Sequence, residues 1–160
     1  MKKKLLLLLM AGFSMVMLPS CGDDDDDANE QKTEAKVDCA SLSGNYYGPL
    51  VKAEDGSSVA DTLGVLVKGN ANGTIDLALE QIVIMNIPVN NLSFPGVPCT
   101  YDAATKVYSF SATDLTTSIM GMDATVDVKE GMFYTENNQL DFVVAVKSPV
   151  AMNLKYSGKK

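Results

Sequence analysis

MDATVDVK, residues 122–129, is the stretch that decides the fold, because apolar and polar side chains alternate along it without a break. The even-numbered positions are apolar and the odd-numbered positions are polar or charged. An alternation of period two places the apolar side chains on one face of an extended chain, where a core can cover them. The sequence therefore predicts a half-buried β-strand here.

The same alternation recurs in short segments divided by Gly, Asn and Asp clusters, and no long stripe of helical period interrupts them. Residues 63–67 and 74–80 flank the turn sequence NANG at 70–73, and this arrangement predicts a β-hairpin. Further strands are predicted at residues 107–112, 131–134, 140–146 and 150–156.

Prolines mark the part of the chain where the pattern is least regular. Residues 82–87 are apolar apart from Asn86 and end at Pro88, which cannot donate to a ladder in the middle of a sheet. We therefore expect a bend or a sheet edge at Pro88. Residues 90–99 contain Pro95 and Pro98 and are expected to be irregular.

The number and order of these segments define the fold class that we expect. About eight strands follow one another along the chain with mostly sequence-adjacent connections. The chain is therefore predicted to be all-β, with an antiparallel up-and-down barrel of about eight strands over residues 38–160. A two-sheet β-sandwich is the alternative, because the same alternation suits both architectures.

The N-terminus has the composition of an export signal. Three lysines at 2–4 precede an apolar segment at 5–18, which is too short to cross a hydrocarbon layer of ~30 Å comfortably. The sequence LPSC at 18–21 resembles the lipobox of bacterial lipoproteins. This resemblance implies that residues 1–20 are a cleaved signal peptide and that Cys21 carries the lipid, which would attach the protein to the outer membrane.

An acidic run follows the cysteine directly. Residues 23–27 are five aspartates, and residues 21–37 contain almost no apolar side chains, so we expect a disordered tether there. The arrangement of Cys21, Gly22 and five aspartates resembles the acidic export signal of Bacteroidetes lipoproteins. That resemblance implies display on the cell surface, with a periplasm-facing protein as the alternative.

Composition excludes several classes of function. Residues 21–160 hold 10 lysines and 20 acidic residues, a net charge of −10, so nucleic acid is not an expected partner. The chain has no His, and all 13 basic residues are lysines. No imidazole base, His-ligated metal site or arginine fork is available, so we expect no enzyme, no metal and no cofactor. The domain at 38–160 alone carries 8 lysines and 13 acidic residues, a net charge of −5.

Two further cysteines, Cys39 and Cys99, form an even pair in a chain expected to enter an oxidising compartment. They are candidates for a disulfide that closes a long loop. The alternative is two separate cysteines. Redox catalysis is not expected, because no CxxC spacing is present.

The sequence GNYYG at 44–48 resembles the signature that opens calycin barrels, with Tyr46 in the aromatic position. With the lipobox, the acidic tether and the strand pattern, the whole chain resembles the calycin-like (lipocalin-like) lipoproteins of Bacteroidetes. The resemblance implies a barrel interior that holds a small apolar or amphipathic ligand, although a solid core would use the same residues. The candidate cavity residues are Tyr46, Met85, Tyr108, Phe110, Met122, Phe142 and Met152.

The expected function is that of a surface-tethered, non-enzymatic binding domain. A structural or accessory subunit of an outer-membrane surface complex, in which the ligand is a glycan, is the alternative from a different class. The sequence does not predict an oligomeric state.

Overall fold

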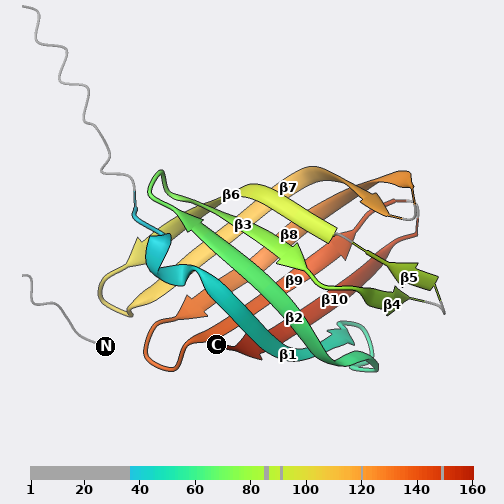
Figure 1. Ribbon diagram of the computed structural model, residues 1–160, viewed down its shortest axis with the longest axis horizontal. Coiled ribbons are helices and arrows are strands. Elements are labelled where there is room, and N and C mark those ends of the chain that lie inside the picture. Colours follow the sequence, from blue (N-terminus) through green and yellow to red (C-terminus); the bar gives the residue numbers. More distant parts are fainter. Residues whose placement is uncertain (1–36, 85–86, 91, 120, 149) are drawn as a thin grey trace, which may run out of the picture. The chain divides into compact units, whose positions relative to one another are not determined.

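A computed structural model describes residues 37–160 except 85, 86, 91, 120 and 149, and the described residues belong to one compact unit. The predicted signal peptide, the predicted lipidation site Cys21 and most of the predicted tether lie outside the described residues. One short 3₁₀ helix and ten strands make up the unit (Figure 1). They are η1 Ala40–Leu42, β1 Gly44–Lys52, β2 Ser58–Asn70, β3 Thr74–Leu79, β4 Ile82–Ile84, β5 Ile87–Val89, β6 Leu92–Asp102, β7 Val107–Ile119, β8 Met122–Tyr134, β9 Gln139–Val146 and β10 Met152–Lys159.

Eight of the strands close into a barrel in the order β1-β10-β9-β8-β7-β6-β3-β2. Every pairing within it is antiparallel, and strands that follow one another in the chain are neighbours in the wall. The first and last strands pair to close the barrel. The prediction of an all-β, eight-stranded up-and-down barrel is confirmed, and the sandwich alternative is wrong. Strands β4 and β5 form a separate two-stranded sheet between β3 and β6.

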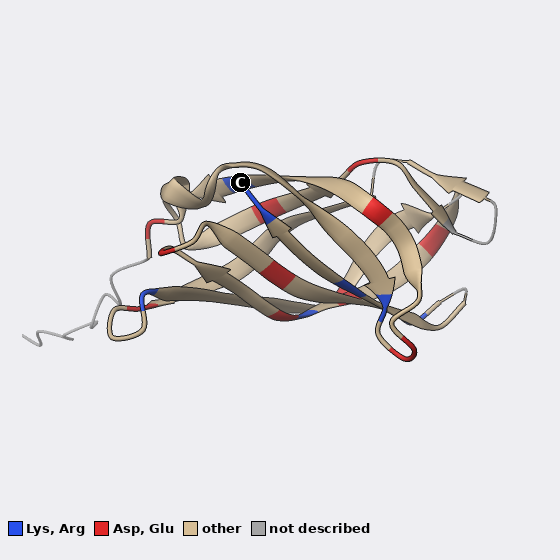
Figure 2. Ribbon diagram, turned by 90° about the horizontal axis from the view of Figure 1, so that it is seen from below, with Lys and Arg blue, Asp and Glu red and all other residues tan. Residues whose placement is uncertain are grey.

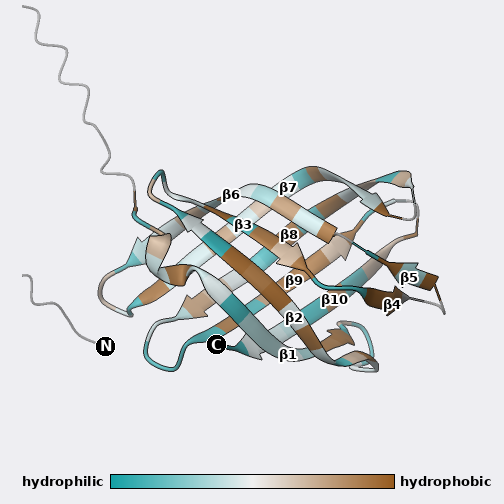
Figure 3. Cartoon of the chain, viewed as in Figure 1, coloured by the Kyte–Doolittle hydropathy of each residue, from teal (hydrophilic) through white to brown (hydrophobic). Residues whose placement is uncertain are grey.

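The alternation that predicted the strands also sets which side chains face inward. In β8, Ala124, Val126 and Val128 are buried, as their even positions require. The predicted hairpin at 63–80 is present, because Val67 pairs with Leu77 across the turn between β2 and β3. Figure 3 shows the resulting alternation of apolar and polar positions along the strands.

The expectation of an irregular segment at 90–99 is wrong, because β6 runs through both prolines as a strand. Gly96 has a φ of 68°, and its N–H donates to the Asp76 carboxylate at 2.8 Å. The register with β3 shifts at the same place. Such a bulge leaves positions outside the regular ladder, so prolines are tolerated there. Pro95 and Pro98 are exposed, while Phe94 and Val97 point into the core.

The barrel has two ends that differ in what covers them. The η1 end consists of η1 and the turns β2–β3, β6–β7 and β8–β9. The β4–β5 end consists of the β4–β5 hairpin and the connections β1–β2, β7–β8 and β9–β10. The two ends lie on opposite sides of the barrel in Figure 1. Acidic and basic side chains are spread over the strands and turns of both ends (Figure 2).

Candidate functional site

The η1 end of the barrel is filled by packed aromatic side chains. The Tyr46 and Phe133 rings meet edge to face at 5.7 Å between centroids, and Tyr46 is fully buried. The Tyr46 hydroxyl donates to the Leu42 carbonyl of η1 at 2.7 Å, which fixes the helix across this end. Burial raises the pKa of Tyr46 to about 12. This end is therefore closed by protein.

The same packing continues into the middle of the barrel. The Phe142 ring lies 5.0 Å from Tyr156 and 6.2 Å from Phe110, and all three side chains are buried. The Tyr156 hydroxyl donates to the Leu63 carbonyl at 3.4 Å. Burial is the main cause that raises the pKa of Tyr156. Aromatic rings thus occupy the interior from η1 to the midpoint of the barrel. We call Tyr46, Phe133, Phe110, Phe142 and Tyr156 the aromatic plug, and the η1 end the plugged end.

The opposite end is covered by the β4–β5 hairpin, which is apolar on both of its faces. Its residues Ile82 and Val89 are 2% and 1% exposed and belong to the core, while Val83 and Ile87 are 51% and 38% exposed. Three residue pairs join the two strands. A hairpin this short is marginal alone, so burial of its inner face must hold it in place.

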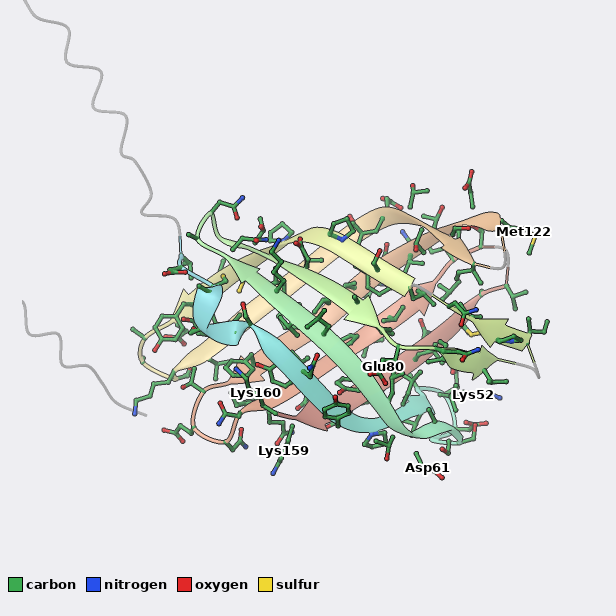
Figure 4. The ribbon with its side chains drawn as sticks, in the orientation of Figure 1. Lys52, Asp61, Glu80, Met122, Lys159 and Lys160 are labelled. Atoms are coloured by element: carbon green, nitrogen blue, oxygen red, sulfur yellow. The ribbon has the colours of Figure 1, made fainter. Side chains whose placement is uncertain are left out.

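Two more exposed apolar side chains lie at the same end. Met122 begins β8 and is 46% exposed, and Val150 in the β9–β10 connection is 51% exposed. Figure 4 shows Met122 at the far tip of the β7–β8 hairpin. We call Val83, Ile87, Met122 and Val150 the apolar rim. Exposed apolar residues that gather in one place are typical of a binding surface.

The pairing of β6 with β7 stops short of this end. Among the described residues, β6 and β7 pair only where Cys99–Asp102 meets Val107–Phe110, close to the η1 end. Beyond that point β7 is bulged twice, and the two strands diverge towards the β4–β5 end (Figure 1). Ala112 and Leu115 are half-buried there against the core. We call this stretch, in which β6 and β7 are not paired, the β6–β7 seam.

The candidate cavity residues from the sequence do not form one site. Tyr46, Phe110 and Phe142 are in the packed aromatic core, and Tyr108 lies 6.3 Å from Phe133 at the η1 end. Met122 belongs to the exposed rim. Met152 is half-buried at the β4–β5 end, and Met85 lies outside the described residues.

Cys39 and Cys99 are both buried and are separate thiols in the structure. Both belong to the same apolar cluster at the η1 end of the barrel. The predicted disulfide remains a prediction.

A shallow depression of about 300 Å³ lies on the outer wall, away from the rim. Exposed Thr100, Ser109 and Met132 are cross-strand neighbours there on β6, β7 and β8. Glu130 has a φ of 52° and adds a carboxylate at the bulge of β8. Hydroxyls and a carboxylate beside a thioether can hydrogen-bond a polyhydroxylated ligand. The lining is Pro98, Thr100, Ser109, Phe110, Ser111, Glu130, Gly131 and Met132.

The carboxylate of Asp127 is buried, and its partners in the fold account for its burial. Asp127 is 3% exposed and accepts hydrogen bonds from Lys147 Nζ at 2.7 Å and from the Asp114 N–H at 2.9 Å. Lys129 Nζ lies 3.3 Å away. The hydrogen bonds from Lys147 and Asp114 hold the pKa of Asp127 at about 2, far below its usual value. All these partners are protein groups, so the cluster stabilises the contact of β8 with β7 and with the end of β9.

Metal and membrane-spanning features were sought in the same residues. In the part of the chain that the structure describes, no three His, Cys, Asp or Glu side chains gather as a metal ion requires. Within residues 37–160, apart from the gaps, no helix is long and apolar enough to cross a membrane. Comparison of the chain with protein-family models, curated proteins and solved structures found no match.

Sequence reasoning missed the apolar rim as a group, although one signal for it was present. The apolar run at 82–85 stands out in a chain whose other strands alternate. An uninterrupted apolar run predicts burial on both faces of a strand. In the structure Val83 is exposed although Ile82 is buried, and this mismatch marks the apolar rim.

Proposed function

We propose that this chain is a lipid-anchored, non-enzymatic binding protein that takes a small apolar or amphipathic molecule at the β4–β5 end of its barrel. One observation carries the proposal: the apolar rim and the β6–β7 seam occur together at the end opposite the aromatic plug. Exposed apolar area there has no protein cover in the described chain, and its burial by a ligand would release about 25 cal/mol per Å².

The position of the predicted anchor supports this assignment. Val37 enters the barrel beside η1, so the anchored chain would leave from the plugged end. Residues 21–36 reach roughly 55 Å when fully extended, at ~3.5 Å per residue. The rim would then lie at the end of the domain farthest from the point where the tether to Cys21 enters. Surface display, inferred from the acidic run at 23–27, would leave it accessible from outside.

Binding of the neutral apolar fluorophore N-phenyl-1-naphthylamine tests the proposal. Val83→Ser and Ile87→Ser together should weaken its binding about tenfold, because each loses part of the contact area and ~1.4 kcal/mol is a factor of ten. Leu66→Ser is the matched control, since Leu66 is 50% exposed on the wall of β2. Fatty acids and bile acids should compete with the probe.

The outcomes of the titration differ clearly. The proposal predicts saturable binding to the wild-type protein, weaker binding to the double variant and unchanged binding to Leu66→Ser. Equal losses in both variants would mean nonspecific adsorption, and an absence of saturable binding by the probe and by the whole panel would contradict the proposal.

The location is tested by two substitutions at the N-terminus. Cys21→Ala should release the protein from membranes, because acyl chains supply the attachment. Alanine at Asp23 to Asp27 should leave the protein membrane-bound but protected from protease added to intact cells. Equal cleavage of the wild type and this second variant would show that the acidic run is only a spacer.

The outer-wall depression favours a second candidate function, that of an accessory subunit that contacts glycan in a surface complex. Its hydroxyls and the Glu130 carboxylate can hydrogen-bond a sugar, and its apolar side chains can contact the sugar ring. Purification from outer membranes in mild detergent separates the two candidates. A stoichiometric partner protein supports the accessory role, and a lone monomer supports the binding protein.

A further inference from the structure

Two thiols from distant parts of the chain meet inside the η1 end. Cys39, directly before η1, is completely buried, and Cys99 on β6 is 5% exposed. Both belong to the same apolar cluster of buried residues. About 60 residues separate them in the sequence, so the fold alone brings the pair together.

The backbone holds both cysteines against the same turn. The Cys39 N–H donates to the Asn70 carbonyl at 3.2 Å, and the Cys99 N–H donates to the Gly73 carbonyl at 2.9 Å. The entering chain also lies directly on β2, since a Cβ at Gly69 would stand 1.6 Å from the Cys39 carbonyl oxygen. Only hydrogen at Gly69 permits this approach. The backbone of both cysteines is thus held against residues 69–73.

We infer that Cys39 and Cys99 are joined by a disulfide in the exported protein, and that this bond fastens the tether-bearing chain to strand β6. Any pull on the lipid anchor would enter the domain at Val37, two residues before Cys39. With the bond in place, this force is transmitted to β6 in the barrel wall. Without the bond, it acts on the single turn of η1. The inference rests on the export part of the proposed function and not on the ligand.

The chemistry needs an oxidant of the disulfide class, such as oxidised glutathione or a protein disulfide donor. The thiolate of one cysteine attacks the oxidant disulfide and releases one thiol. The thiolate of the other cysteine then displaces the second thiol from this mixed disulfide. Two electrons pass to the oxidant, and each cysteine loses one proton.

Burial also determines when the bond forms. Desolvation raises the pKa of both the Cys39 and the Cys99 thiols, and the thiolate is the reactive form. The closed barrel therefore hides the pair from reagents. We conclude that oxidation takes place while the chain folds, before η1 closes this end.

Counting free thiols tests the bond in the full chain, exported by a Gram-negative host and acid-trapped without reductant. Under denaturing conditions we expect no maleimide–polyethylene glycol tag, and two tags after dithiothreitol. Two tags before reduction would overturn the inference. One tag before reduction and three after would still support the bond, but would contradict lipidation of Cys21, and Cys21→Ala would remove that extra tag.

Stability and kinetics give independent readouts. Reduction should lower Tm by roughly 10 °C, given the length of the closed loop. The double variant Cys39→Ser, Cys99→Ser should have the Tm of the reduced protein, and dithiothreitol should no longer change it.

Oxidised glutathione should form the bond at least about tenfold faster in urea than in the folded reduced protein. Equal rates would contradict formation before closure.

Discussion

At the residue scale, Asp127 shows how one carboxylate holds an irregular strand in place. Asp114 sits in the bulge of β7 with a φ of 56°, and its N–H donates to Asp127 on β8. Lys147 on the far side bridges both carboxylates at 2.7 Å. The ionised carboxylate therefore stabilises the left-handed backbone at Asp114, which is unfavourable by itself.

Asp127→Asn should make the thermal stability of the protein less sensitive to a fall in pH. Because the pKa of Asp127 is lowered to about 2 in the fold, its stabilising effect is complete above the unfolded value near 4 and is lost as pH falls towards 2. The variant should have a Tm several degrees lower at pH 7, and the difference from wild type should shrink between pH 4 and 2. Thermal denaturation across this range measures it.

Asp123→Asn is the matched control, because it makes the same change at an exposed position of the same strand. A constant Tm difference for Asp127→Asn at every pH would contradict the role of its charge. The sequence placed Asp127 on the solvent side by alternation alone. It could not show that the bulge of β7 and Lys147 cover it, since a bulge depends on the neighbouring strand.

At the element scale, the β4–β5 hairpin can be separated from the barrel that carries it. Leu79 and Leu92, which flank it, are direct partners across β3 and β6. Replacement of residues 80–91 by Asn-Gly would therefore join the two strands through a two-residue turn. We expect a cooperative β-barrel with a lower Tm, since the buried contacts of Ile82 and Val89 are lost.

The same variant should bind N-phenyl-1-naphthylamine much more weakly than wild type, because half of the apolar rim is removed. Far-UV circular dichroism and a thermal transition verify the fold before the titration. Unchanged or tighter binding by a folded variant would place the ligand site elsewhere.

The elements that local sequence could predict are those with a clear turn and strict alternation. The β2–β3 hairpin follows from NANG between two alternating segments. Strand β6 did not follow, because its prolines are tolerated only through the bulge at Gly96 and the Asp76 carboxylate from β3. The Asp76 carboxylate that stabilises the bulge lies outside β6, so the sequence of β6 alone does not predict it.

At the scale of the whole molecule, the two ends of one barrel differ in the side chains that cover them. Closure depends on the pairing of β1 with β10, which joins the beginning and the end of the domain. Alternation fixed the strands but could not separate a barrel from a sandwich, because this pairing is nonlocal. The division into a plugged end and an apolar end was also beyond the sequence, since Tyr46, Phe110 and Phe142 suit a core and a cavity equally.

The most direct test of this division is methyl NMR of the mature chain with Cys21→Ala, titrated with N-phenyl-1-naphthylamine. The account predicts shifts at the β4–β5 end, in the methyl groups of Val83, Ile87 and Met122, while those of Leu42 and Val67 at the η1 end stay unchanged. Shifts centred on Leu42 and Val67, or no shift at any methyl group, would contradict it.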